Sequence, residues 1–203
     1  MRPMSTENKK LFIFDWGNVI VENIYCNEAI AKELGIPVDI FYEDYAWYSM
    51  PLLDGVISTR AYWEHVSRRF NLPPIKEELF QKHFHPQVID ITARLVKALR
   101  ASGKRVVGGT NTYAPHFVKL HAMGVHDLFD KVYASHDIGL SKPTDEFFKH
   151  ILECEGYKGE EAFFIDDVEA YHRGAKNNGI ETLLFAGEDR DERLKEAFSW
   201  LSF

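Results

Sequence analysis

The feature that most constrains the fold is a repeated alternation of short apolar runs with helical patterns along the chain. The runs predict strands at residues 11–14, 105–109, 131–134, 162–165 and 181–185. Between the later strands, apolar residues recur at helical spacing over about 115–124 and 144–156, and a polar helix is expected from residue 168 to about Asn178. Strands that alternate with helices form a parallel sheet covered by those helices. We therefore predict an α/β fold with a parallel sheet and helices on both of its faces.

The first connection is much longer than the others. Roughly 90 residues separate the first two predicted strands, whereas a simple strand–helix–strand unit needs about 30. Helical patterns inside this connection cover residues 27–34, 38–48, 58–70 and 75–84, and Ser58 is a candidate N-cap. We therefore predict a core made of residues 1–20 and 93–203. Residues 21–92 are predicted to form an α-helical cap over the active edge of the sheet.

Composition and charge exclude several classes of protein. The net charge of -7 argues against a nucleic-acid surface, which needs clustered Lys and Arg. The longest apolar runs are far shorter than the roughly 20 residues of a membrane-spanning helix, and residues 1–7 lack the apolar stretch of a signal peptide. A cytoplasmic protein without membrane contact is the expectation. Cys26 and Cys154 are far apart and are expected to be ordinary core thiols, and the sequence makes no prediction of oligomeric state.

Polar residues stand at or soon after the ends of four predicted strands. Asp15 ends the first run, Thr110 the second, and Lys142 follows the third. The pair Asp166-Asp167 ends the fourth. Because open α/β sheets place their chemistry at the carboxyl ends of the strands, we expect these side chains to form one site. Taken singly, each also has a structural interpretation as a helix cap, a turn residue or a surface lysine.

The set matches the needs of phosphoryl transfer, which are a carboxylate, a divalent cation, donors to the phosphate oxygens and a fixed positive charge. Asp15, Asp166, Asp167 and the Gly17 carbonyl are the candidate Mg²⁺ ligands. The Thr110 hydroxyl and the Asn111 backbone N–H are candidate phosphate donors at the start of a helix. Lys142 is expected to offset the repulsion among the carboxylates.

These segments, in this order, resemble the haloacid dehalogenase superfamily in its subgroup with an inserted α-helical cap. The matching segments are Phe14-Asp15-Trp16-Gly17-Asn18-Val19-Ile20, Val106-Val107-Gly108-Gly109-Thr110-Asn111, Gly139-Leu140-Ser141-Lys142-Pro143, and Phe163-Phe164-Ile165-Asp166-Asp167 followed by Gly174-Ala175. The resemblance covers residues 11–185. It implies a Rossmann-like sheet with the first strand at its centre, Asp15 as nucleophile, Lys142 as a catalytic and phosphate-binding residue, and Mg²⁺ as cofactor.

Two positions depart from the family pattern. Most phosphatases of this superfamily carry a general-acid Asp where this chain has Gly17, so a substrate with an easily expelled leaving group is expected. A sugar 1-phosphate fits this requirement, and the Asp-x-Gly-Asn-Val segment also resembles bacterial α-glucose-1-phosphate phosphatases. His172 is a candidate substitute proton donor. Tyr171 stands where relatives often have Asn, which bears on the groups surrounding the metal site.

The sequence therefore predicts an enzyme of the hydrolase class. It would be a Mg²⁺-dependent phosphatase that hydrolyses a small phosphorylated metabolite through an aspartyl-phosphate on Asp15. Two alternatives stay open. One is a 2-haloacid dehalogenase, which uses the same aspartate without a metal, although Gly17 and the Asp166-Asp167 pair weigh against it. The other is a catalytically silent member that binds a phosphometabolite.

Overall fold

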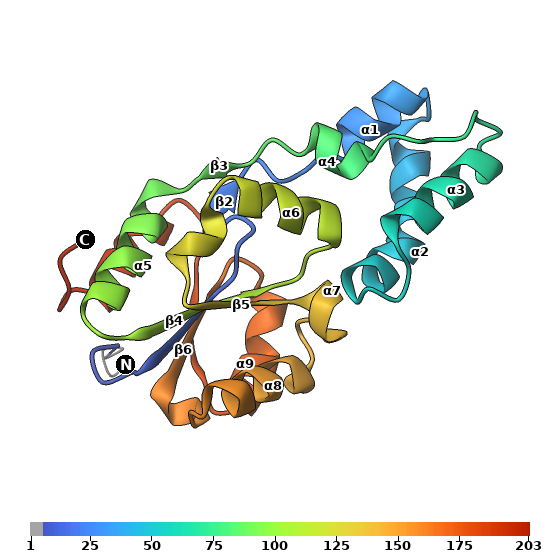
Figure 1. Cartoon of the computed structure of the whole chain (residues 1–203). Coiled ribbons are helices and arrows are strands. Elements are labelled where there is room, and N and C mark those ends of the chain that lie inside the picture. Colours follow the sequence, from blue (N-terminus) through green and yellow to red (C-terminus); the bar gives the residue numbers. More distant parts are fainter. Residues whose placement is uncertain (1–5) are drawn as a thin grey trace.

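A computed structural model of the chain describes residues 6–203, and its centre is one parallel sheet of five strands. The strands lie in the order β5-β4-β1-β6-β7 (Figure 1). Their bounds are Leu11–Phe14 for β1, Arg105–Thr110 for β4, Lys131–Ala134 for β5, Ala162–Asp166 for β6 and Glu181–Leu184 for β7. Central β1 pairs in parallel with β4 and β6. The predicted sheet, with the first strand at its centre, is confirmed.

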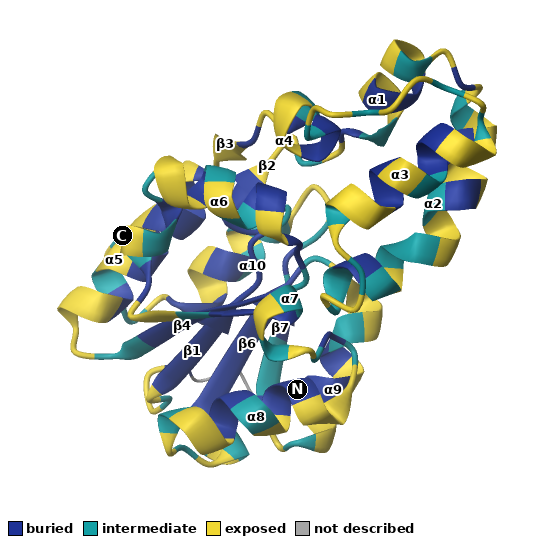
Figure 2. Ribbon diagram, turned by 45° about the vertical axis from the view of Figure 1, so that its right-hand side comes forward, coloured by how far each residue is buried: buried dark blue, intermediate teal, exposed yellow. Residues whose placement is uncertain are grey.

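The two faces of the sheet are buried in separate apolar clusters. Phe12 and Phe14 of β1 face one cluster, and Leu11 and Ile13 face the other, because side chains alternate along a strand. All four side chains are fully buried, and the central strands β1 and β6 are coloured as buried in Figure 2. A strand buried on both faces reads as a continuous apolar run, which explains the sequence Leu-Phe-Ile-Phe.

Helices cover both faces of the sheet, as predicted. One face carries α5 (Asp90–Ala101), α6 (Ala114–Ala122) and α10 (Arg190–Ala197). The opposite face carries α8 (Asp145–Glu155) and α9 (His172–Asn177). Short helical segments complete the core: α7 (Ser135–Ile138), η1 (Val125–Leu128), η2 (Gly159–Glu161) and η3 (Glu169–Tyr171).

The long first connection folds into four helices at one end of the molecule, at the upper right of Figure 1. They are α1 (Asn27–Leu34), α2 (Val38–Leu53), α3 (Thr59–Arg69) and α4 (Leu79–His83). Strands β2 (Val21–Glu22) and β3 (Gln87–Val88) pair antiparallel where the chain leaves and re-enters the core. The helices share an apolar cluster of their own, which contains Phe41, Tyr62 and Phe80. The division of the chain into a core and a cap of residues 21–92 stays a prediction.

Three local expectations differ from the structure. The helix expected at 75–84 begins only at Leu79, because the Glu78 side chain caps it and also accepts hydrogen bonds from Thr59 and Trp63 of α3. Helix α2 continues to Leu53 instead of ending near residue 48. Cys26 is a buried thiol as expected, but Cys154 is exposed because it lies at the edge of the apolar stripe of α8, in the last turn.

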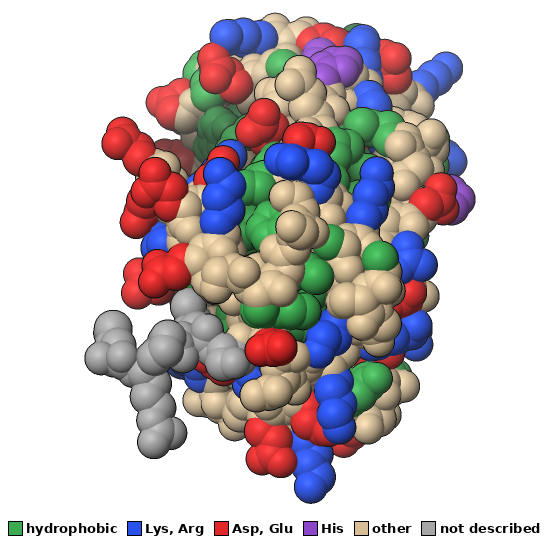
Figure 3. All heavy atoms as spheres, turned by 90° about the vertical axis from the view of Figure 1, so that its left-hand side faces the viewer, with side chains coloured by type: hydrophobic (Ala, Val, Ile, Leu, Met, Phe, Trp, Pro, Cys, Tyr) green, Lys and Arg blue, Asp and Glu red, His purple; other side chains and the backbone are tan. Residues whose placement is uncertain are grey.

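Ser58 is the N-cap of α3, as predicted, and its side chain accepts a hydrogen bond from Ala61 N at 3.2 Å. Within residues 6–203, no helix combines the length and apolar character required to cross a membrane. On the face shown in Figure 3, basic and acidic side chains are interspersed around a small apolar area.

Candidate active site

The carboxyl edge of the sheet collects the predicted site residues. Asp15 directly follows β1, Thr110 ends β4 and Asp166 ends β6, and these three strands are neighbours. The Asp15 N–H donates to Ile165 O at 2.9 Å, which extends the pairing of β1 with β6 by one residue. All three side chains are buried, so their geometry is set by the sheet rather than by a mobile loop.

Lys142 is the centre of the site. Its Nζ lies 2.7 Å from Asp15 Oδ1 and 2.7 Å from Asp166 Oδ2, and its side chain is fully buried. The Asn111 side chain fixes the Lys142 backbone from both sides. Asn111 Oδ1 accepts from Lys142 N at 2.9 Å, and Asn111 Nδ2 donates to Lys142 O at 2.9 Å. The rings of Phe164 and Tyr171 lie 5.5 and 5.1 Å from the ammonium group.

Two opposing effects set the pKa values of the carboxylates in the site: burial raises them, and the positive charge of Lys142 lowers them. Burial raises the pKa of Asp15 to about 6, Lys142 lowers it and Asp166 raises it. Burial likewise raises the pKa of Asp166, again against the effect of Lys142. For Lys142, burial lowers the pKa, but the two carboxylates together raise it above its ordinary value. At neutral pH the lysine is therefore charged, and the Asp15 carboxylate beside it is ionised.

Three carboxylates form a group able to hold a metal ion. One oxygen each from Asp15, Asp166 and Asp167 lies within 4.8 Å of the other two. Asp166 Oδ1 accepts from Val168 N at 2.7 Å, and Asp167 Oδ2 accepts from Asn18 Nδ2 at 3.0 Å. Burial also raises the pKa of Asp167. Oxygen ligands crowded at this spacing fit a divalent cation such as Mg²⁺, which would relieve the repulsion among them.

Thr110 and Asn111 lie at the same edge, but the local structure differs in part from expectation. The predicted helix N-terminus is not at Asn111, because α6 begins three residues later at Ala114. The Asn111 side chain is committed to the Lys142 backbone. Both residues line the cavity described below. A phosphate-binding role for the Thr110 hydroxyl and the Asn111 N–H stays a prediction.

Gly17 lies beside the proposed nucleophile, and Ile24 takes up the space next to it. A Cβ atom at position 17 would lie 3.9 Å from Asp15 Oδ2 and only 2.8 Å from Ile24 Cδ1. His172, the candidate substitute for the missing acid, is directed elsewhere. It is buried, and its Nε2 lies 3.2 Å from the Asp166 carbonyl oxygen. Burial lowers its pKa, so it is neutral at pH 7 and is not among the cavity residues.

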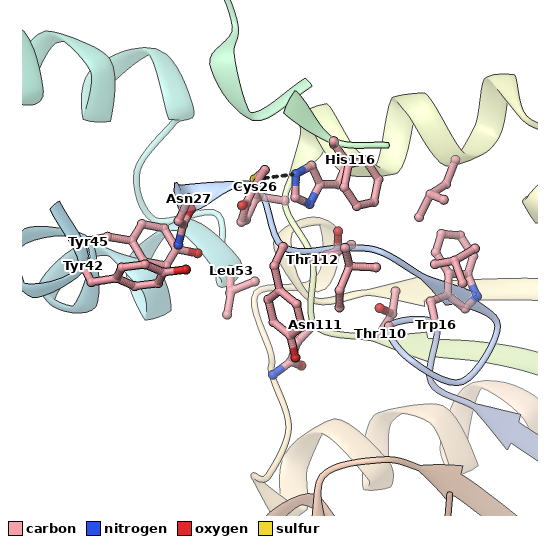
Figure 4. Close-up of a pocket in the computed structure, with 17 residues that line it drawn as sticks. Trp16, Cys26, Asn27, Tyr42, Tyr45, Leu53, Thr110, Asn111, Thr112 and His116 are labelled. Atoms are coloured by element: carbon pink, nitrogen blue, oxygen red, sulfur yellow. Dashed lines mark hydrogen bonds between the residues drawn. The ribbon is translucent and has the colours of Figure 1, made fainter. Parts of the chain in front are cut away.

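A cavity of about 330 Å³ lies between the sheet edge and the inserted helices (Figure 4). Its core side includes Trp16, Gly17, Thr110 and Asn111. The opposite side comes from the inserted segment and is formed by Ile24, Tyr25, Cys26, Asn27, Tyr42, Tyr45, Leu53 and Phe84. The remaining lining residues are Val21, Thr112, Tyr113, His116 and Leu120. The acidic cluster therefore adjoins a partly open cavity of the size that binds small molecules.

Sequence reasoning missed two residues of this region. Asn18, which holds Asp167, has a φ of 52°, a left-handed backbone conformation that Asn tolerates better than most residues. Its position next to Gly17 was the only feature of the sequence that could have indicated this role. Asn27 lines the cavity from the start of α1, and nothing in its local sequence distinguishes it from a helix-terminal polar residue.

Comparison with known sequences gives a family match and partial relatives. The family model described as haloacid dehalogenase-like hydrolase matches residues 9–179. Glyceraldehyde 3-phosphate phosphatase of Methanocaldococcus jannaschii is 39% identical over 75 residues, which cover 36% of this chain and 33% of that protein. The GMP/IMP nucleotidase YrfG of Escherichia coli is 35% identical over 95 residues, which cover 46% and 42%. The chain thus matches less than half the length of either relative.

Solved structures share the fold. A HAD-family enzyme of Bacteroides thetaiotaomicron, in a magnesium complex, superposes with a TM-score of 0.79 over 93% of this chain and 100% of that one, at 23% identity. A 2-haloacid dehalogenase of Pseudomonas syringae gives a TM-score of 0.69 at 19% identity, covering 95% and 99%. At these identities the likeness extends to the fold alone, because one fold hosts different chemistries.

Proposed function

This chain belongs to the haloacid dehalogenase-like hydrolase family, and from that premise we propose that it is a Mg²⁺-dependent phosphatase of small phosphorylated metabolites. The observation that carries the proposal is the group of Asp15, Asp166 and Asp167 bridged by buried Lys142. The named phosphatase relatives support the same reaction class. The acidic group favours a metal-dependent phosphatase over the metal-free dehalogenase alternative.

Asp15 is the proposed nucleophile. Lys142 occupies Asp15 Oδ1, which leaves Oδ2 on the side of Gly17. The carboxylate oxygen attacks phosphorus, the ester P–O bond breaks, and the leaving oxygen takes a proton from a water molecule. Water then attacks the phosphorus of the aspartyl-phosphate, which releases inorganic phosphate and restores the Asp15 carboxylate. Lys142 and Thr110 would hold the phosphate oxygens during both steps.

Mg²⁺ is the proposed cofactor. Asp15, Asp166, Asp167 and the Gly17 carbonyl oxygen would hold it, and when bound it supplies positive charge that offsets the negative charge of the transferring phosphoryl group. The pKa values of all three carboxylates are raised, so their ionised forms are unfavourable in the absence of a further positive charge, which a bound cation would supply. Lys142 alone brings one positive charge to three negative groups.

The proposed substrate is a sugar 1-phosphate. Positioned acid catalysis contributes about 10² to 10⁴-fold, and position 17 has no acid to provide it. An anomeric oxygen is a better leaving group than an ordinary alcohol, so a sugar 1-phosphate suffers least from the loss. Hexose 1-phosphates should be hydrolysed faster than the corresponding 6-phosphates, and equal kcat/KM values for the two would contradict this argument.

Phosphate release from a metabolite panel tests the function. We expect turnover with Mg²⁺ that disappears with a chelator and in Asp15→Asn. Asp137→Asn, which changes an exposed carboxylate of α7, is the matched control and should keep full activity. Turnover that survives chelation would contradict the metal, and halide release from a 2-haloacid without Mg²⁺ would favour the dehalogenase. Thermal stabilisation by a sugar phosphate without phosphate release would favour the silent binder.

A further inference from the structure

Asn18 lies in a tight turn that follows the proposed nucleophile. The Trp16 carbonyl oxygen accepts from Ile20 N at 2.8 Å and from Val21 N at 2.9 Å, so the chain reverses its direction within a few residues. In this turn Asn18 has a φ of 52°, a left-handed backbone conformation that Gly, Asn and Asp adopt more readily than other residues. The turn therefore restricts position 18 to a few residue types before any side-chain contact is considered.

The backbone of Asn18 fixes the direction of one proposed metal ligand. Its N–H donates to Val21 O at 2.7 Å. This N–H and the Gly17 carbonyl belong to one planar trans peptide group, in which the C=O and the N–H bonds point in opposite directions. Because the N–H bond is held by Val21, the Gly17 carbonyl oxygen is held on the opposite side of the peptide group.

The side chain of Asn18 holds a second proposed ligand. Asn18 Nδ2 donates to Asp167 Oδ2 at 3.0 Å. Lys142 contacts Asp15 and Asp166 directly, and both of these carboxylates are buried. Asp167 is less buried and forms no ion pair in the described part of the chain, where Asn18 is the one side chain hydrogen-bonded to its carboxylate. The orientation of Asp167 therefore depends on this amide.

A second acceptor orients the same amide. The hydroxyl oxygen of Tyr25, an exposed residue of the inserted segment, lies 3.2 Å from Asn18 Nδ2. The two N–H bonds of the amide thus have separate acceptors, Tyr25 and Asp167. At position 18, glycine would permit the turn but would supply no donor, and aspartate would bring a negative charge against Asp167. Asparagine combines the left-handed turn with a donor to the carboxylate.

We propose that Asn18 is a positioning residue that fixes two of the four proposed Mg²⁺ ligands, the Gly17 carbonyl through its backbone and Asp167 through its side chain. Residues that hydrogen-bond to metal ligands typically change the metal affinity by about 10- to 100-fold when they are removed. The inference rests on the metal site of the proposed function. It assigns a role to a residue outside the proposed ligands and explains why asparagine stands next to Gly17.

Four variants separate the side-chain contact from the backbone conformation. Asn18→Gly removes the donor but adopts a positive φ freely, whereas Asn18→Ala removes the donor and adds left-handed strain. Asn71 has the same φ of 52° at an exposed position after α3, so Asn71→Gly and Asn71→Ala are the matched controls. Calorimetric titration with MgCl₂, without substrate, measures the Kd for Mg²⁺, and melting temperatures without Mg²⁺ check that each variant is folded.

Asn18→Gly should raise the Kd for Mg²⁺ by at least about 10-fold, and Asn18→Ala should raise it further because the Gly17 carbonyl is then displaced as well. Both Asn71 variants should stay within about two-fold of the unchanged protein. A Kd within two-fold in Asn18→Gly would overturn the side-chain role. Equal Kd values for Asn18→Gly and Asn18→Ala would overturn the backbone role.

A double-mutant cycle tests whether the Asn18 side chain acts through Asp167. Once Asp167→Ala has removed the acceptor, adding Asn18→Gly should change the Kd for Mg²⁺ by less than about two-fold. If Asn18→Gly weakened Mg²⁺ binding equally with and without the Asp167 carboxylate, the amide would act by another route and the inference would be wrong.

Hydrolysis of p-nitrophenyl phosphate by the unchanged protein separates this inference from the function it rests on. If Mg²⁺ supports hydrolysis while the Asn18 variants bind Mg²⁺ normally, the inference fails and the phosphatase proposal stands. If the variants lose Mg²⁺ affinity as expected but the unchanged protein hydrolyses neither this ester nor any metabolite, the phosphatase proposal fails and the inference stands. Failure of the unchanged protein to bind Mg²⁺ would contradict both.

Discussion

At the scale of the residue, one buried lysine organises the site. Lys142 joins two carboxylates from different strands, and Asn111 holds its backbone through two hydrogen bonds. The sequence suggested that the lysine offsets carboxylate repulsion, and its 2.7 Å contacts with Asp15 and Asp166 have the geometry for that task. Tyr171, which departs from the family pattern, contributes a ring against the ammonium group.

Lys142→Met removes the charge and keeps most of the volume. Because it leaves two buried carboxylates without their partner, we expect the free energy of unfolding without Mg²⁺ to fall by about 3–5 kcal/mol at pH 7. The kcat/KM for the best substrate should fall by about 10² to 10³-fold. Urea denaturation and steady-state kinetics measure the two effects. Lys149→Met, at an exposed position of α8, should change neither, and a stable, fully active Lys142→Met would contradict the assigned role.

At the scale of the element, close packing between helix α9 and the segment before α8 fixes the position of Lys142. Gly174 of α9 lies so near this segment that a Cβ atom there would be 2.4 Å from Pro143 O and 3.0 Å from Thr144 O. Both contacts are with backbone, which cannot move aside as a side-chain end could. Close packing therefore requires a glycine at position 174, and this packing affects Lys142 through its neighbour Pro143.

Gly174→Ala should push these elements apart. We expect the free energy of unfolding to fall by about 1–3 kcal/mol, as for other overpacked sites. The kcat/KM should fall as well, because Lys142 moves with Pro143. Lys176→Ala, an exposed alanine substitution in the same helix, serves as the control for helix propensity. If Gly174→Ala melted at the temperature of the unchanged protein, the packing argument would be wrong.

At the scale of the whole molecule, the inserted helices meet the core through an aromatic contact around His116. This side chain of α6 stacks on Phe84, with ring centroids 3.7 Å apart, and its Nε2 lies 3.8 Å from Cys26 Sγ. Burial lowers the pKa of His116 from 6.5 to about 3. The folded protein thus requires a neutral imidazole at His116, where α6 contacts Phe84 and Cys26.

This requirement makes stability depend on pH. Below pH 6.5 the unfolded chain binds a proton at His116 that the folded chain rejects, so stability is full above that pH and is lost progressively as the pH falls toward 3. Between pH 7.5 and 5.5 the loss from this residue is about 1.4 kcal/mol. His116→Gln should remove that part of the pH dependence, whereas His121→Gln, at an exposed position, should keep it. Denaturation curves at both pH values measure the difference, and an unchanged dependence in His116→Gln would contradict the assignment.

How far the sequence predicted the structure depends on the range of the interactions involved. The five strands agree to within one residue because a strand buried on both faces needs a local apolar run. The helix predicted at 75–84 was too long because the Glu78 carboxylate accepts hydrogen bonds from Thr59 and Trp63. No local sequence pattern indicates these contacts. Asn111 was expected at the start of a helix, but its side chain forms hydrogen bonds with the backbone of Lys142, 31 residues later in the chain.

The sequence by itself determined the parallel sheet and the polar groups at its carboxyl edge, since short runs and their last residues are local features of the chain. Tertiary structure alone decided that Lys142 bridges Asp15 and Asp166, that Ile24 adjoins Gly17, and that the cavity is free of charge. These three features depend on the positions of side chains from separate helices, strands and loops. That placement is set by packing and desolvation across the whole fold.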